Sequence, residues 1–360
     1  MFQHIIGGDL FVVAGPCSAE SEEQLRATCQ ALMTTGRVHL LRCGAWKPRT
    51  RPGGFEGRGE EALRWIAALK RQHPTWLFAV EVATPRHVEM ARRHGMDALW
   101  IGARTTGNPF LVSELAATLR EEPLPVMVKN PMSADAALWA GALERLQQAG
   151  ITDVAAVHRG FSVPSPLHPE MRNDPVWRIP LELRRIMPQV PLLCDPSHLT
   201  GDKEQVATCC QTALNLGFDG LMIESHIHPE EALTDARQQL TPAKLHALLD
   251  TLHPRPSHAP TPAELTVLRE RLDLIDDELL KLLAQRLNLS RHIAAVKEAH
   301  GLCTYQPARW GDKLGKLLPA ASALGLEEAF AKDILERLHL ESIRVQEQRR
   351  SANKSGTPKQ

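Results

Sequence analysis

The feature that most constrains the fold of this chain is an alternation of short apolar runs with amphipathic helical stretches up to about residue 253. The helical stretches include EEQLRATCQALMTT and AALWAGALERLQQAG, and the apolar runs read LFVVAG, HLLRC, LFAVEV, ALWIGA, PVMVKN, DVAAVHRG, PLLCDPS and DGLMIES. Eight strand-then-helix units in about 250 residues predict an α/β protein with a (β/α)8 (TIM) barrel over residues 1–253. A doubly wound open sheet is the alternative, but no glycine-rich turn follows the first run.

Chemically active residue types gather at the carboxyl ends of these runs. In a (β/α)8 barrel the active site lies at the carboxyl ends of the strands, so such residues from different strands would meet at one mouth. Chance scatter would have placed some of them at the starts of runs. The residues at run ends are Cys17, Arg42, Arg104, Lys129, Arg159, His198 and Glu224.

Four residues set far apart in the chain form a candidate metal site: Cys17, His198, Glu224 and Asp235. Taken singly, Cys17 could be a buried structural thiol and Asp235 a solvated surface acid. Glu224 is harder to explain that way, because a buried carboxylate needs a partner. A thiolate, an imidazole and two carboxylates suit a borderline divalent ion such as Mn, Fe or Zn better than Ca or Mg.

Five cations near this set predict a pocket for anionic groups. A positive charge at the end of a buried strand is costly unless an anion meets it. Arginine offers paired donors to phosphate and carboxylate, whereas lysine acts as a point charge. A solvated surface loop is the alternative for the segment RCGAWKPRTRPGGFEGRG. The cations are Arg42, Lys47, Arg104, Lys129 and Arg159, and together they indicate an enzyme for phosphorylated or carboxylated substrates.

The overall charge is balanced, since Lys plus Arg and Asp plus Glu both total 42. A balanced charge gives no reason to expect nucleic acid or an anionic membrane as a partner. The segment MFQHIIGGDLFVVAG lacks the basic and apolar regions of a signal peptide, and no apolar stretch is long enough to span a bilayer. Seven cysteines without framework spacing are typical of reduced thiols. We therefore expect a cytoplasmic protein.

The pattern changes after residue 253. Residues 254–262, PRPSHAPTP, contain four prolines and predict a semi-rigid linker. An all-helical domain is expected over 263–350, with a long first helix to roughly residue 300, a second near 307–318 and a third from about 326. The polar sequence of residues 351–360, SANKSGTPKQ, predicts a disordered tail. The first helix carries the seam of a coiled coil and predicts a homodimer; the seam residues are Leu265, Leu268, Leu272, Ile275, Leu279, Leu282, Leu289, Ile293 and Val296.

One position of this seam is charged, because Arg286 lies between Leu282 and Leu289. At ~100° per residue, Arg286 and Lys297 point within about 20° of each other and could grip one anion. Arg269 falls roughly 80–100° off that face and is better placed to reach a partner's site. A polar residue that sets the register of the coiled coil is the alternative. Ser342 and Gln346 share a face of the third helix and could add neutral hydrogen bonds.

The motifs of the first 250 residues resemble a known family. The segments AGPCSAE, RCGAWKPRT, IGAR, VKN, HRG, DPSH and MIES are similar to those of 3-deoxy-D-arabino-heptulosonate 7-phosphate (DAHP) synthases of the compact class I-beta group. The related 3-deoxy-octulosonate 8-phosphate synthases carry Lys-Ala-Asn where this chain has Lys47, Pro48, Arg49 and Thr50. The loop therefore favours the heptulosonate enzyme, although Arg51 stands where that family has serine.

This resemblance implies the condensation of phosphoenolpyruvate with erythrose 4-phosphate, with a divalent metal ion as cofactor. Cys17 and His198 would act through the metal, and Lys47 would be the general acid near the aldehyde. Arg49 and Thr50 would hold the phosphate of the aldose. The full set of substrate-binding residues implied for the barrel is Arg42, Lys47, Arg49, Thr50, Arg104, Lys129, Arg159 and Asp195.

Residues 264–350 resemble the all-helical AroQ-type chorismate mutases, which implies rearrangement of chorismate to prephenate. Lys297 and Gln346 would donate to the ether oxygen of the substrate. Gln306 replaces an acid of that family, and Trp310 stands where the bacterial prototype has glutamate. The substrate-contact positions are Arg269, Arg286, Lys297, Arg309, Ser342 and Gln346.

The two resemblances together imply a bifunctional, allosteric enzyme of the shikimate pathway. We hypothesise that prephenate or chorismate in the helical domain inhibits the synthase, with the linker allowing the domains to dock. The alternative is an octulosonate synthase barrel joined to a non-catalytic helical dimerisation module. A metal-dependent barrel hydrolase is a third possibility, but such sites usually use several histidines and this set has one.

Overall fold

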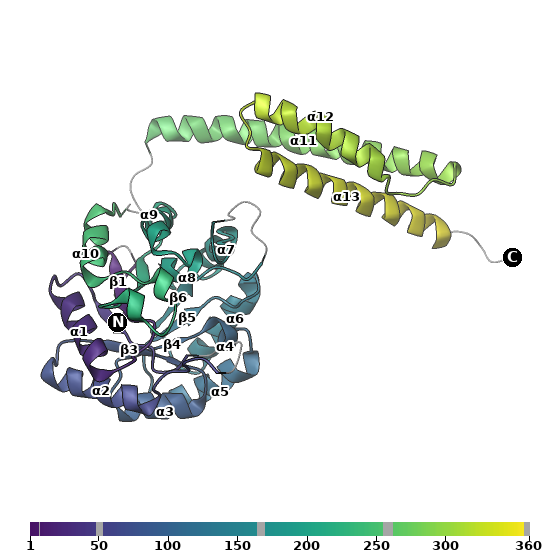
Figure 1. Cartoon of the computed structure of the whole chain (residues 1–360). Coiled ribbons are helices and arrows are strands. Elements are labelled where there is room, and N and C mark those ends of the chain that lie inside the picture. The colour runs from purple at the N-terminus through teal and green to yellow at the C-terminus, as the bar shows by residue number, and fades with distance from the viewer. Residues whose placement is uncertain (7, 48–52, 164–169, 255–261, 356–360) are drawn as a thin grey trace. The chain divides into compact units, whose positions relative to one another are not determined.

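The computed structural model describes all of the chain except residues 7, 48–52, 164–169, 255–261 and 356–360. It divides into two compact units, Met1–His258 and Ala259–Gln360, which are shown in Figure 1. Among the described residues, no helix combines the length and apolar character needed to cross a membrane.

The first unit is a closed barrel of eight parallel strands in sequential order (Figure 1). This confirms the fold predicted from the alternating pattern. The ring is closed where β1 pairs with β8, with Phe11 opposite Gly220 and Gly15 opposite Glu224. The strands are β1 Phe11–Gly15, β2 Leu40–Arg42, β3 Phe78–Val82, β4 Ala98–Ile101, β5 Val126–Lys129, β6 Val154–His158, β7 Leu192–Cys194 and β8 Gly220–Glu224.

Helices follow the strands around the barrel, and polar caps set where several of them begin. Ser21 accepts a hydrogen bond from the Gln24 amide at 3.1 Å, and Asp135 accepts one from the Leu138 amide at 3.0 Å. The α-helices are α1 Glu22–Met33, α2 Glu60–Gln72, α3 Pro85–Arg93, α4 Ala103–Thr106, α5 Pro109–Arg120, α6 Ala136–Gln148, α7 Arg178–Ile186, α8 Pro196–Thr200, α9 Val206–Asn215 and α10 Pro242–Thr251. The 3-10 turns are η1 Phe2–His4, η2 Lys203–Gln205, η3 Pro229–Glu231 and η4 Ala236–Gln238.

The core has an inner and an outer layer, because successive strand residues point to opposite faces of the sheet. Val13, Trp100 and Met222 belong to a buried cluster inside the barrel, and Phe2 of η1 packs into the same cluster. The Phe2 amide donates to Asp153, the residue before β6, at 2.7 Å. Since η1 covers the amino ends of the strands, the carboxyl ends form the open mouth.

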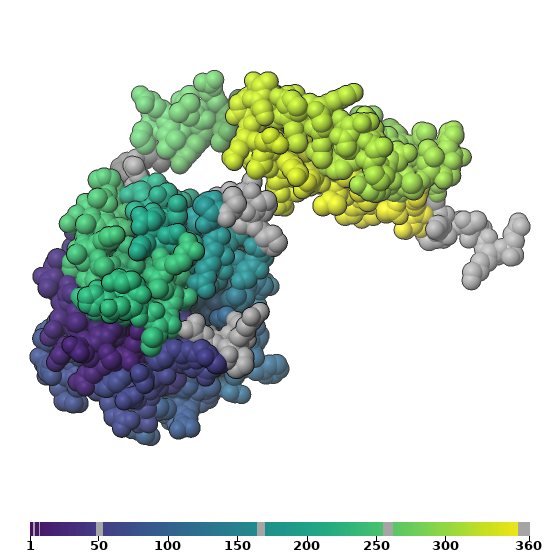
Figure 2. Space-filling model, in the orientation of Figure 1, coloured from purple at the N-terminus to yellow at the C-terminus, as the bar shows by residue number. Residues whose placement is uncertain are grey.

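The second unit is a three-helix bundle of α11 Ala263–Ala299, α12 Pro307–Ala323 and α13 Glu328–Ser355. The first turns of α11 extend beyond α12 and α13 (Figure 1, Figure 2). The seam residues there are exposed in the single chain, as Leu272 is at 57%.

Two expected boundaries in this unit are wrong. The second helix was expected to end near residue 318, but α12 continues through Pro319 to Ala323. The tail was expected to begin at residue 351, but α13 runs on to Ser355. Residues 356–360 and most of the linker 254–262 lie outside the described part of the chain.

Candidate active sites

The mouth of the barrel holds a cluster of possible metal ligands. Ligand atoms of Cys17, Glu224 and Asp235 all lie within 4.8 Å of one another. Cys17 follows β1, Glu224 ends β8 and Asp235 lies in the next loop, so the cluster sits across the closing pair of strands. His198, on α8 after β7, is not one of the three, but its Nε2 lies 3.7 Å from Glu224 Oε1. The structure therefore brings all four expected ligands to one place.

The His198 ring is held so that Nε2 faces this cluster. Its Nδ1 lies 3.0 Å from Asp195 Oδ1, and its backbone amide donates to the same oxygen at 3.1 Å. Lys129 Nζ donates to Asp195 Oδ2 at 2.6 Å. A carboxylate behind the far ring nitrogen is the usual support of a metal-binding histidine. Burial lowers the pKa of His198 to about 4, which keeps the Nε2 lone pair available.

Lys47 lies between two of the candidate ligands. Its Nζ is 2.8 Å from Cys17 Sγ and 2.7 Å from Asp235 Oδ2. Burial, reinforced by Glu224, raises the pKa of the Cys17 thiol to about 12. Burial alone would lower the pKa of Lys47, but the neighbouring thiol and carboxylates raise it. The ammonium group therefore neutralises part of the negative charge of the cluster.

The donor set fits a divalent ion. It combines a thiol, an imidazole nitrogen and two carboxylates, as borderline metals prefer. Glu224 Oε1 is buried and accepts no hydrogen bond from the described residues. The nearest cation is Arg42, whose Nη2 is 3.0 Å from that oxygen. A buried oxygen with free lone pairs in a ligand cluster is what a metal site requires.

Three of the five expected anion-binding cations are buried at strand ends: Arg42, Lys129 and Arg159. Arg42 lies over the Trp100 ring at 5.1 Å, and its Nε and Nη1 have no hydrogen-bond partner in the described chain. Burial lowers the pKa of Arg159 to about 10. Unsatisfied buried donors of this kind are suited to a bound anion.

Three further residues of the barrel were expected at the substrates: Arg104, Arg49 and Thr50. Arg104, on α4, is exposed. Burial is the largest cause of the lowered pKa of Arg159, Asp195 opposes it, and the charges of Arg172 and Arg104 lower the pKa further. Arg49 and Thr50, expected at the phosphate of the aldose, lie outside the described residues.

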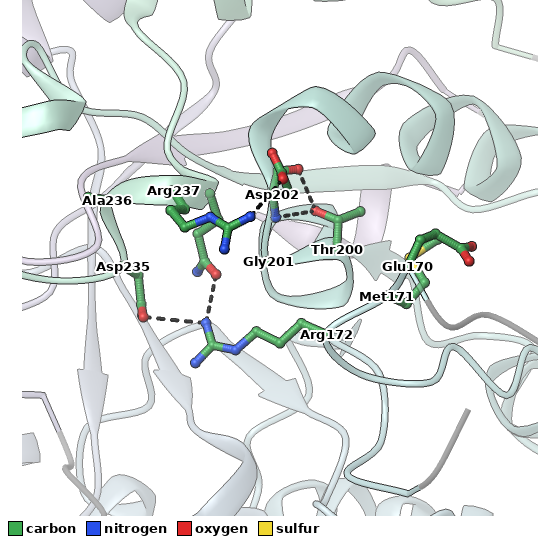
Figure 3. A pocket seen from close by; sticks show the side chains of 10 residues that line it. Glu170, Met171, Arg172, Thr200, Gly201, Asp202, Asp235, Ala236 and Arg237 are labelled. Carbon is green, nitrogen blue, oxygen red and sulfur yellow. Dashed lines mark hydrogen bonds and ion pairs between the residues drawn. The ribbon is translucent and has the colours of Figure 1, made fainter. Parts of the chain in front are cut away.

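A cavity of about 480 Å³ adjoins the cluster and was not expected (Figure 3). It shares Asp235 with the candidate metal site and is lined by the loops after β6, β7 and β8. Arg172 Nη1 donates to Gln238 Oε1 at 2.8 Å and lies 3.3 Å from Asp235 Oδ1. Gln238 Nε2 donates to Glu224 Oε2 at 2.6 Å. The only feature of the sequence that could have indicated a role for Gln238 in this site is its position three residues after Asp235.

The helical unit has a second polar site, within the bundle. Arg286 Nη1 donates to Ser342 Oγ at 2.7 Å and to the Leu338 carbonyl at 2.9 Å. Lys297 Nζ donates to the Thr304 carbonyl at 2.6 Å. Gln346 Oε1 is buried without a hydrogen-bond partner among the described residues. The structure thus places Arg286 against the face of α13 that carries Ser342 and Gln346.

Arg309 and Arg269 take different positions relative to this site. Arg309 is exposed on α12. Burial is the largest cause of the lowered pKa of Lys313, and the charges of Arg286 and Arg309 lower it further. The three cations therefore lie in one region of the bundle. Arg269 is exposed on α11, 17 positions before Arg286. At 1.5 Å per residue that separation is about 25 Å, so Arg269 does not join the site of its own chain.

Trp310, one of the two departures from the mutase pattern, lies near the same site through its contact with His339. Trp310 stacks on His339 with 4.0 Å between ring centroids and 11° between planes. His339 Nε2 is buried and unpaired in the part of the chain described. Burial, then Lys313, Arg286 and Lys297, lower the pKa of His339, which keeps the ring neutral.

Two family models match the chain. Residues 2–256 match the DAHP synthetase I family, and residues 268–347 match chorismate mutase type II.

Individual relatives match the same two regions. A phospho-2-dehydro-3-deoxyheptonate aldolase of Thermotoga maritima is 30% identical over 240 residues, which is 65% of this chain and 67% of the relative. The T-protein of Enterobacter agglomerans is 41% identical over 80 residues, 22% of this chain and 21% of the relative. A 2-dehydro-3-deoxyphosphooctonate aldolase of Wolinella succinogenes is 22% identical over 274 residues, 68% of this chain and 98% of the relative.

Solved structures agree on the barrel. The crystal structure of the Thermotoga maritima aldolase (DAHP synthase) aligns with a TM-score of 0.59 and 27% identity, covering 67% of each chain. A truncated form of the 3-deoxy-D-arabino-heptulosonate 7-phosphate synthase from the same organism aligns with a TM-score of 0.56 and 25% identity. That alignment covers 67% of this chain and 84% of the other.

Proposed function

The chain belongs to the DAHP synthetase I family and carries a chorismate mutase type II domain, and we propose a working mechanism for each half on that premise. The barrel condenses phosphoenolpyruvate with erythrose 4-phosphate, and the helical unit rearranges chorismate to prephenate. The protein is a bifunctional enzyme of the shikimate pathway. The observation that carries the barrel assignment is the cluster of Cys17, Glu224 and Asp235, with His198 beside it, in a mouth lined by buried cations.

Phosphoenolpyruvate binds to the buried cations of the barrel. Arg42, Lys129 and Arg159 offer charged donors in a region with little water, where contacts to phosphate and carboxylate are strongest. Arg104 completes the phosphate site from the exposed rim. Asp195 orients Lys129 and His198 through hydrogen bonds of 2.6 and 3.0 Å. Arg49 and Thr50 are assigned to the aldose phosphate on the strength of their motif.

Cys17, His198, Glu224 and Asp235 would hold a divalent ion, and the chemistry of these donors suits Mn, Fe or Zn. When bound, this ion supplies Lewis acidity that polarises the aldehyde carbonyl.

Lys47 is the general acid of the condensation. The enol carbon of phosphoenolpyruvate attacks the aldehyde carbon, and negative charge develops on the aldehyde oxygen. Because its neighbours raise the pKa of Lys47, this residue arrives protonated and can deliver a proton from Nζ to that oxygen. Water then adds to the cationic carbon that bore the enol phosphate, and the tetrahedral intermediate collapses with loss of inorganic phosphate.

The rearrangement of chorismate needs no nucleophile, and the helical site acts by holding the substrate in its reactive shape. Arg286 binds one carboxylate with support from Ser342. Lys297 and Gln346 donate to the ether oxygen as charge develops on it. Arg309 adds positive charge from α12, and Arg269 of a second copy binds the other carboxylate.

A homodimer follows from this assignment. The α11 seam is apolar and exposed in the single chain, and a second copy would bury it while bringing Arg269 to the partner site. Light scattering after gel filtration tests this. A full-length chain that stays monomeric at micromolar concentration contradicts it.

The decisive test of the barrel function is phosphate release from phosphoenolpyruvate with each of two aldose phosphates. We expect release with erythrose 4-phosphate, loss of release with a chelator and recovery when Mn²⁺ is added back. Cys17→Ala should abolish release, whereas Cys303→Ala, at an exposed cysteine of the helical unit, should leave it intact. Faster release with arabinose 5-phosphate would favour the octulosonate synthase instead.

Feedback is the finer part of the proposal: prephenate bound in the helical unit inhibits the synthase. The test adds prephenate to the full-length chain and to Arg286→Met, which lacks a carboxylate-binding residue. Inhibition of the unchanged chain and none of the variant supports the link. Equal inhibition of both, or of neither, rejects it.

A further inference from the structure

Gln238 of η4 is a buried side chain that bridges two charged groups. It is 1% exposed, and both ends of its amide are used. Nε2 donates to Glu224 Oε2 at 2.6 Å, and Oε1 accepts from Arg172 Nη1 at 2.8 Å. Figure 3 shows the Arg172 side chain extending from the loop after β6 toward Asp235.

The orientation of this amide depends on Arg172. An amide has one donating end and one accepting end, and a guanidinium can only donate. Arg172 therefore selects the oxygen of Gln238, which leaves the NH₂ group for the Glu224 carboxylate. With the amide turned over, an oxygen would face a carboxylate and an NH₂ group would face a guanidinium. Both contacts would be repulsive.

The same guanidinium also touches the second acid of the cluster. Arg172 Nη1 lies 3.3 Å from Asp235 Oδ1, while Asp235 Oδ2 faces Lys47 Nζ at 2.7 Å and Cys17 Sγ at 3.5 Å. One arginine outside the expected ligand set thus contacts Asp235 directly and Glu224 through one intervening side chain.

We propose that Arg172 is a positioning residue for the metal site, fixing Glu224 through Gln238 and Asp235 by direct contact. The inference rests on the metal site of the proposed function and adds a residue to its outer layer. Partners of this kind typically change metal affinity ~10–100-fold when removed.

A simple charge effect would act in the opposite direction. A cation close to a metal site repels the ion, so its removal would tighten binding. The Arg172 side chain is 48% exposed and its charge is screened by water, so repulsion should be the weaker effect. The sign of the change therefore separates positioning from charge.

The experiment is a titration of the full-length apo protein with Mn²⁺, following the loss of the free-ion signal by electron paramagnetic resonance. We expect Arg172→Met to weaken Mn²⁺ binding by ~10-fold or more. Arg237→Met is the matched control, because Arg237 lines the same cavity but is 84% exposed and pairs with Asp202 at 3.1 Å. It should bind Mn²⁺ as the unchanged chain does.

Gln238→Met tests the same contacts from the buried residue, because Gln238 links Arg172 to Glu224. It should also weaken binding. Arg172→Met added to it should cost less than Arg172→Met costs alone, because the path through Gln238 is already broken and only the direct contact with Asp235 is left to lose. This variant carries the test if Arg172→Met does not fold.

Three results would overturn the inference. The first is an Arg172→Met protein that binds Mn²⁺ as well as, or better than, the Arg237→Met control. The second is weak binding by Gln238→Met alone, with Arg172→Met unaffected, since the glutamine would then act without the arginine. The third is an unchanged chain that binds no Mn²⁺, Fe²⁺ or Zn²⁺, which removes the metal site of the proposed function together with the inference.

Discussion

Replacing Arg286 by methionine separates a catalytic helical unit from a purely structural one. Arg286 occupies a seam position between Leu282 and Leu289, where a coiled coil prefers an apolar residue. Its guanidinium contacts Ser342 Oγ and the Leu338 carbonyl. Partial burial lowers the pKa of Arg286, which means that its positive charge is less stable there than in water. A bound anion would offset this loss of stability.

The expected stability change is small. Ser342 Oγ itself donates to the Leu338 carbonyl at 2.7 Å, so neither partner is left unsatisfied when Arg286 is removed. Losing these two hydrogen bonds of a half-exposed guanidinium costs about 1–3 kcal/mol, and the apolar methionine in the seam recovers about 1–2 kcal/mol. We therefore expect the free energy of unfolding to change by less than about 2 kcal/mol.

The expected effect on turnover is large. Arg286 holds a carboxylate of the substrate, and a reacting group that is misplaced by loss of such a contact can cost ~10²-fold in rate. Prephenate formation by Arg286→Met should fall by that factor while the phosphate-release rate of the barrel stays unchanged. Arg337→Met is the control, since Arg337 is exposed on α13 and pairs only with Asp333 among the contacts described.

Two measurements decide between the readings: chorismate consumption, and urea unfolding followed by circular dichroism. A loss of turnover below about tenfold, with a gain in stability, would show that the helical unit serves dimerisation rather than catalysis. Loss of more than about 3 kcal/mol of stability would show that the contacts of Arg286 hold the bundle together instead.

Three further changes test the rest of the structure. Lys129→Met removes the lysine that pairs with the buried Asp195 carboxylate and should lower the free energy of unfolding in urea by about 3–5 kcal/mol. A decrease below about 1 kcal/mol would contradict a buried ion pair. Burial lowers the pKa of His158 to about 3 from an ordinary 6.5, so the unfolded chain binds more protons below pH 6.5 and stability falls as the pH drops from there. His158→Phe should flatten this slope by up to about 1.4 kcal/mol per pH unit, and an unchanged slope argues against the buried neutral ring. His339→Phe keeps a ring on Trp310 and removes an unsatisfied nitrogen, so it should stabilise the helical unit by about 1 kcal/mol; a lower Tm in thermal unfolding refutes this.

The barrel could be predicted because its strands are short buried runs that end in charged residues. VMVK and GLMIE are buried along their whole length, so each run marks a strand, and Lys129 and Glu224 mark where it stops. Parallel strands in a closed sheet bring all such ends to one mouth. This is why Arg42, Lys129 and Glu224 could be assigned to one site without knowledge of any loop.

The supports of the site could not be predicted, because they come from loops with no period. Gln238 lies in a 3-10 turn and Asp235 has a left-handed backbone with φ of 47°. No alternation of apolar residues signals such a conformation. The position of Lys47 between Cys17 and Asp235 depends on loop geometry as well. The second helix was expected near 307–318, and α12 continues through Pro319 to Ala323, although proline usually ends or kinks a helix.

The pairing of β1 with β8 has a consequence for how the enzyme matures. Cys17 and Asp235 are 218 residues apart in sequence, and their meeting depends on the last strand closing against the first. During synthesis the thiol leaves the ribosome early and cannot join its acidic partners until nearly the whole barrel has emerged. If the proposed metal site is real, loading would follow closure of the barrel, and the bound ion would link residues beside β1 and β8.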